Sequence, residues 1–218
     1  MTSRLFSTIL PVVAAAALSF GSTAQAELLL EPTSENGHGY FYGSGVTFGY
    51  KFTLTTTETV AALGIWDRDS DGLVGPHEVG LWTSTGTLLA STTITNSSVV
   101  VDSTFAGGRW LFEDISSISI GAGDYYLGMQ QPSTGQDFYT RGPVAVNIAG
   151  ASKGTGSAGG FGTDALVFPG GASNADGFFG PNFSTESVEA VPEPGTAALL
   201  GMSLVGLAGV RRRRATAV

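Results

Sequence analysis

The sequence predicts an all-β fold for the middle of the chain, an antiparallel β-sandwich or jelly roll. Three observations support this prediction. One stretch alternates strictly between apolar and polar residues, several shorter β-rich runs follow it, and turn signals separate these runs. The same region has no sustained helical periodicity, and Thr, Ser and Gly are abundant where a helix would need strong helix formers.

The alternating stretch is the clearest strand. From Val46 to Leu54 every second residue is apolar, which is typical of a half-buried strand. Further strands are predicted at 59–66, 77–82, 87–94, 109–115, 125–131 and 165–168. The glycine-rich region 149–180 is either a flexible loop or a segment whose apolar residues, such as Phe168, return to the sandwich together with Phe183 just after it. The predicted β-sandwich domain is 27–183, followed by an acidic linker at 184–190.

Composition limits the partners. The chain of 218 residues has a formal net charge of -8 and no cysteine, which excludes disulfides and thiolate metal sites. Between Glu27 and Val191 there are 5 basic and 17 acidic residues, a formal charge of -12. Such a surface repels phosphate backbones, which argues against nucleic acid as a partner.

The N-terminal segment has the features of a secretory signal. Arg4 precedes an apolar run from Ile9 to Phe20, and the polar residues that follow end in Ala24-Gln25-Ala26. A positive residue, a short apolar run and small residues at this spacing predict a signal peptide at 1–26, with Ala24 and Ala26 at the cleavage site. A membrane anchor is the alternative, but the run is shorter than the ~20 residues that a spanning helix needs.

The C-terminal segment has three elements in a fixed order. Pro192-Glu193-Pro194 comes first, an apolar stretch at 196–210 follows, and Arg211, Arg212, Arg213 and Arg214 come last. The prolines keep the backbone extended and accessible. The apolar helix would span about 24 Å, slightly less than a ~30 Å hydrocarbon core, and the arginines would hold the extreme C-terminus in the cytoplasm.

This tail resembles the PEP-CTERM sorting signal of Gram-negative, exopolysaccharide-producing bacteria, over 191–214. The resemblance implies that an exosortase, a membrane cysteine transpeptidase, recognises Pro192, Glu193 and Pro194 and processes the tail. It further implies export, transient anchoring in the inner membrane through the transmembrane helix, and a final place in the envelope, on the outer surface or outside the cell. An ordinary C-terminal anchor is the alternative.

The body also resembles a known family. The stretch from Val60 to Ala90, together with 122–127 and 178–183, is similar to a β-sandwich domain family of unknown function that recurs in bacterial surface and carbohydrate-associated proteins. This resemblance spans most of 28–183 and implies no catalytic residues.

One acidic loop has the spacing of a metal site. Asp67, Asp69 and Asp71 occupy positions one, three and five, Gly72 position six and Glu78 position twelve of an EF-hand calcium loop. Strands are predicted on both sides where an EF-hand has helices. The loop therefore predicts either a calcium site between strands, made by these carboxylates, or an acidic turn without metal.

Neither histidine, His38 or His77, lies in a recognisable catalytic frame. The aromatic residues Trp66, Trp82, Trp110, Tyr125, Tyr126 and Tyr139 could include a sugar-stacking platform, although such residues more often fill a core. We expect an exported, non-enzymatic module that binds extracellular polysaccharide. A structural or adhesive matrix component without a ligand, and a secreted hydrolase, are the two alternatives.

Overall fold

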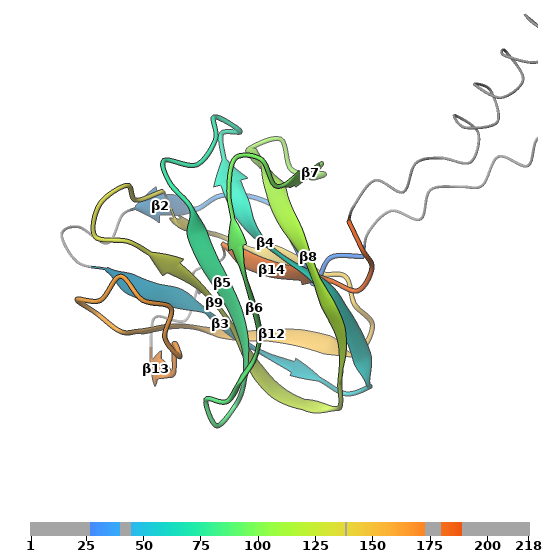
Figure 1. Cartoon of the computed structure of the whole chain (residues 1–218). Coiled ribbons are helices and arrows are strands. Elements are labelled where there is room, and N and C mark those ends of the chain that lie inside the picture. The colour runs from blue at the N-terminus through green and yellow to red at the C-terminus, as the bar shows by residue number, and fades with distance from the viewer. Residues whose placement is uncertain (1–26, 40–44, 138, 173–179, 189–218) are drawn as a thin grey trace, which may run out of the picture. The chain divides into compact units, whose positions relative to one another are not determined.

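The computed structural model describes residues 27–39, 45–137, 139–172 and 180–188 (Figure 1). The predicted signal peptide, with Ala24 and Ala26, lies outside the described residues, and so does the predicted sorting tail with 192–194 and 211–214. Within the described part, no helix has the length and apolarity needed to cross a membrane.

Strands of the described residues pair antiparallel throughout and form two main sheets. The larger sheet has the order β13 (Gly171–Ala172), β12 (Ala151–Gly159), β3 (Val46–Leu54), β9 (Gly123–Gln131), β5 (His77–Thr83) and β6 (Leu88–Ile94). The smaller sheet has the order β14 (Pro181–Ser184), β4 (Glu58–Arg68), β8 (Gly108–Ile120) and β7 (Val99–Val101). Two short ladders pair β1 (Leu30–Pro32) with β11 (Val144–Val146) and β10 (Tyr139–Arg141) with β2 (Gly37–Gly39).

The two sheets enclose one apolar core, as the predicted sandwich requires. Successive side chains of a strand point to opposite faces, so β3 directs every second residue inward. Phe48, Tyr50 and Phe52 of β3 are fully buried there. They pack in one cluster with Leu63 and Ile65 of β4, on the opposite sheet. The all-β prediction is confirmed for the described residues.

Most predicted strands are present, with ends that differ by a few residues. The strand Val46–Leu54 has the predicted bounds, while β8 extends beyond the predicted Ile115 to Ile120. The prediction of a strand at 165–168 is wrong. The backbone N–H of Val167 donates to Thr47 Oγ1 at 3.0 Å, and this segment lies across the outer face of the larger sheet instead of joining it. The glycine-rich region contributes β12 instead, a strand that was not predicted.

The two ends of the folded domain lie side by side. Leu29 N donates to Phe183 O at 3.0 Å, and Thr185 N donates to Glu27 O at 3.1 Å, so the first described residues run along β14. The Asn182 side chain adds to this contact, accepting from Leu30 N at 3.1 Å and donating to Leu30 O at 2.7 Å. Because Ser184 belongs to β14, the segment expected to be a linker begins inside the sheet.

Candidate functional site

The acidic loop connects the two sheets. β4 of the smaller sheet ends at Arg68 and β5 of the larger sheet begins at His77, so strands flank the loop, as predicted. Asp69 and Ser70 adopt left-handed backbone angles, with φ of 63° and 57°, and Gly72 has φ of 93°. These angles turn the chain sharply, and glycine adopts them at the least cost.

The aspartates of this loop have different environments. Asp67 is 2% exposed, and its carboxylate accepts from Arg109 Nε at 2.8 Å and from the backbone N–H of Gly72 at 3.2 Å. Burial raises the pKa of Asp67 above its ordinary value, and the bonds from Arg109 and Gly72 offset this only in part. Asp69 pairs with Arg68 at the surface.

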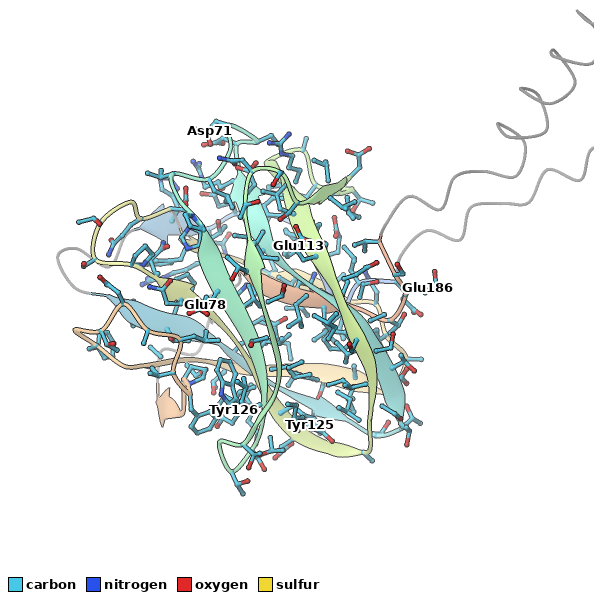
Figure 2. The ribbon with its side chains drawn as sticks, viewed as in Figure 1. Asp71, Glu78, Glu113, Tyr125, Tyr126 and Glu186 are labelled. Carbon is cyan, nitrogen blue, oxygen red and sulfur yellow. The ribbon has the colours of Figure 1, made fainter. Side chains whose placement is uncertain are left out.

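Asp137 is a further acidic residue at this loop. Together with Asp67 and Asp71 it lines a small cavity of about 80 Å³. Its carboxylate accepts from Val74 N at 3.0 Å. Glu78 lies apart on β5, well away from Asp71 (Figure 2). Among the residues that the structure describes, no three acidic or histidine side chains come close enough to form a metal-binding group.

Sequence spacing could not reveal Asp137, because it comes from the distant segment after β9. Of the four carboxylates singled out from the sequence, Asp67 lies near the end of β4, Glu78 lies on β5, and the other two lie in the loop between them. Only Asp67 and Asp71 line the cavity.

Both histidines are bound to carboxylates. His77 is fully buried, with Nδ1 2.9 Å from Gln130 O and Nε2 2.5 Å from Asp137 Oδ2. His38 Nδ1 lies 2.6 Å from Glu35 Oε1. Because both ring nitrogens of His77 contact protein oxygens, that side chain holds the segment after β9 against the start of β5.

Two of the three tryptophans close the outer face of the smaller sheet. Trp66 and Trp110 are neighbours on β4 and β8, with ring centroids 5.0 Å apart, and both are buried. Phe105 stacks on Trp66 at 6.1 Å from a crossing loop. Trp110 Nε1 donates to Glu31 Oε2 at 3.0 Å. These aromatics form a second apolar cluster and are closed to a sugar.

The third tryptophan lies flat on the outer face of the larger sheet. A side-chain carbon on Gly80 would lie 2.5 Å from the Trp82 ring, and one on Gly128 would lie 3.0 Å from it. These glycines are paired across β5 and β9, so they form a flat floor for the indole. Phe168, from the segment wrongly predicted as a strand, covers the ring at 6.3 Å and leaves Trp82 only 3% exposed.

Next to Trp82 on this face, Tyr126 is only half-buried. It pairs with Trp82 on one side and with Lys51 on the other, and its ring meets Phe168 edge to face at 5.0 Å. Tyr125 points the other way, stacking on Phe52 at 5.6 Å, and Tyr139 packs against Phe48 at 5.8 Å.

An ion pair lies beside the Tyr126 ring. Lys51 Nζ is 2.6 Å from Asp124 Oδ2, and Thr53 Oγ1 donates to Asp124 Oδ1 at 2.6 Å. The bonds from Lys51 and Thr53 lower the pKa of Asp124, and the bond to Asp124 raises the pKa of Lys51. Both side chains therefore stay charged near neutral pH. We call Lys51, Asp124, Tyr126 and Phe168 the aromatic patch.

Comparisons with known proteins identify two regions of the chain. Residues 32–179 match the family described as Domain of unknown function (DUF4082), and residues 190–214 match the PEP-CTERM protein-sorting motif. The predicted resemblance of the tail is thereby confirmed. No curated protein and no solved structure matches the chain significantly. The chain therefore belongs to the DUF4082 family, and it carries a PEP-CTERM sorting motif after the family domain.

Proposed function

We propose that this exported protein is a non-enzymatic module of the cell envelope that binds extracellular glycan through the aromatic patch. The PEP-CTERM match supports export and recognition by an exosortase, because the motif is a protein-sorting signal. The glycan-binding part rests on one observation. Tyr126 is a half-buried ring on the outer face of a sheet, with the charged pair Lys51 and Asp124 beside it.

The chemistry of the aromatic patch suits a sugar. A sugar ring has an apolar face of C–H groups that can pack on an aromatic ring, and its hydroxyls can bond to charged side chains. Tyr126 supplies the ring, Asp124 supplies acceptors and Lys51 supplies donors. Because these groups come from the neighbouring strands β3 and β9, the sheet fixes their spacing before a ligand arrives.

The test is binding of the folded protein to a panel of neutral and acidic polysaccharides, measured by affinity electrophoresis and calorimetry. Tyr126→Ala should weaken binding about fivefold or more, since contact with an aromatic ring of this kind is worth about 1 kcal/mol. Phe105→Ala is the matched control, because Phe105 is also a half-buried ring but lies on the opposite outer face. This control should bind normally.

Two other outcomes would favour the alternatives. Unchanged binding in Tyr126→Ala would rule out the aromatic patch, and no binding to any glycan would favour a structural or adhesive matrix component. Turnover of a polysaccharide that is lost when a carboxylate is changed would favour a hydrolase.

We also propose a weak calcium site in the loop between β4 and β5. Asp67, Asp71 and Asp137 line one small cavity, and this supports the proposal. The described side chains are not gathered into a metal-binding group, so a bound ion would have to draw the three carboxylates together. A cation there would neutralise Asp67, whose charge burial disfavours. Asp69 and Glu78 remain candidates from the sequence, but the cavity favours Asp137 in their place.

Mass spectrometry of the mature protein tests the sorting part of the proposal. The protein taken from the envelope should begin at Glu27 and lack Arg211 to Arg214. If the surface-exposed form keeps these arginines in cells with an active exosortase, sorting by this route is wrong.

A further inference from the structure

The last described residues are docked onto the folded domain. We call Thr185 to Val188 the C-terminal segment. Ser184 ends β14, and its hydroxyl accepts from Glu186 N at 3.1 Å and donates to Glu186 O at 2.8 Å, which turns the chain out of the sheet. The register places Ser184, Ala62 and Asp114 in one row across β14, β4 and β8. Ala62 is fully buried in the outer apolar cluster, against which Val188 also packs.

Asp114 holds the far end of this segment. Its Oδ1 accepts from Val188 N at 2.8 Å, and its Oδ2 accepts from the Ser187 hydroxyl. Val188 also packs on the outer aromatic cluster with Trp66 and Trp110. At the near end, Thr185 N donates to Glu27 O at 3.1 Å. Figure 2 shows Glu186 at the edge of the domain where the described chain ends.

The docked segment ends very close to the sorting motif. The motif match begins at 190, and only residues 189–191 separate Val188 from Pro192. Three extended residues reach about 10 Å, whereas a domain of this length has a radius of gyration of roughly 15 Å. With the C-terminal segment released, residues 185–191 reach about 24 Å. A membrane enzyme therefore has little room beside the domain until the segment undocks.

We propose that Asp114 is a positioning residue that controls access of the processing enzyme to the tail. The docked segment shortens the chain that connects the domain to the bond near Pro192, and release of Val188 and Ser187 from Asp114 lengthens it. This inference rests on the proposed sorting function. It concerns access to the bond and leaves the chemistry of cleavage to the enzyme.

The experiment compares full-length variants in membranes that contain an active exosortase, with loss of the tail followed by mass spectrometry. Asp114→Ala removes both acceptors and should raise the rate of tail loss about fivefold or more, since each hydrogen bond shifts such an equilibrium by about that factor. Asp164→Ala is the matched control. Asp164 binds Ser133 N at 2.7 Å and Ser133 Oγ at 2.9 Å, the same pair of donors at another site.

A disulfide gives the opposite change. The chain has no cysteine, so the double variant Asp114→Cys with Ser187→Cys can form a single intramolecular bridge. The oxidised form should lose its tail several-fold more slowly than the wild type, and a reductant should restore or exceed the wild-type rate.

A second readout does not depend on the exosortase. A glutamate-specific protease should cut after Glu186 several-fold faster in Asp114→Ala than in the wild type or in Asp164→Ala. Equal rates in all variants would overturn the role of Asp114, whether or not the tail is processed. If the exosortase cleaves a known substrate but never this chain, the sorting function fails, and the protease still decides whether Asp114 holds the segment.

Discussion

The two outer faces of the sandwich carry aromatic residues for different purposes. On the smaller sheet, Trp66 and Trp110 are covered by a crossing loop and by Val188, which closes the face as a second core. On the larger sheet, Phe168 buries Trp82 but contacts Tyr126 only edge to face, so Tyr126 stays half-buried beside an ion pair. An aromatic residue in a strand is therefore a binding candidate only where the segments packed on it leave part of its ring exposed.

The largest predicted change is a loss of stability on the outer face of the smaller sheet. Trp110→Ala should lower the free energy of unfolding by about 3–5 kcal/mol, because it removes a fully buried ring that contacts Trp66 and Phe112. Chemical denaturation of the folded domain measures this. A loss below about 1 kcal/mol would mean that the outer cluster is not a second core.

A smaller loss is expected from the carboxylate beneath that cluster. Glu31 is 8% exposed and accepts from Trp110 Nε1 at 3.0 Å and Thr104 N at 2.7 Å. Glu31→Ala leaves both donors without this acceptor and should cost about 1–3 kcal/mol in denaturation experiments. Glu113→Ala is a control with one side-chain hydrogen bond, to Ser98, and should cost less. Equal losses would show that burial of the donors is unimportant.

The loop that joins the two sheets should respond modestly to calcium. At calcium tenfold above the dissociation constant, mass action adds about 1.4 kcal/mol, a rise of roughly 3–5 °C in melting temperature. Asp71→Asn should abolish much of this rise, whereas Asp69→Asn should leave the rise unchanged, because Asp71 lines the cavity and Asp69 does not. Calorimetric melting with calcium, with magnesium and with chelator measures it. An unchanged melting temperature of the wild type between chelator and calcium would mean that the loop is an acidic turn without a metal site.

The smallest predicted change is the effect of pH on glycan binding at the aromatic patch. The pKa of Asp124 is lowered by Lys51 and Thr53, so its favourable contribution is present above the usual aspartate pKa and is lost as pH falls through the lowered value. The pKa of Lys51 is raised, so its contribution is present below the usual lysine pKa and is lost as pH rises through the raised value.

Glycan affinity should therefore stay flat between about pH 5 and pH 9 and fall below about pH 4. Calorimetric titration across this range measures it. Asp124→Asn should bind more weakly at neutral pH and lose the acid-side fall. If Asp124→Asn kept the wild-type dependence of glycan affinity on pH, Asp124 would have no part in ligand binding.

Much of the strand pattern was predictable, because it depends on local spacing. The alternation from Val46 to Leu54 gave the bounds of β3, and the β-rich runs gave β4, β5, β8 and β9 within a few residues. The strand prediction at 165–168 was wrong because the apolar residues of this segment match the composition of a strand. Pro169 and the surrounding glycines favour a loop, and the hydrogen bond of Val167 to a side chain takes the place of a ladder bond.

The all-β class, the acidic character of the body and the sorting motif at the C-terminus were all evident in the amino-acid sequence. These properties follow from composition and from patterns a few residues long. Other features depend on tertiary packing: the partial exposure of Tyr126 beside the buried Trp66 and Trp110, the place of Asp137 beside Asp67 and Asp71, and the bond from Val188 to Asp114. Alternation assigns side chains to two faces, but exposure depends on which distant segment covers each face, and long-range packing alone fixes that.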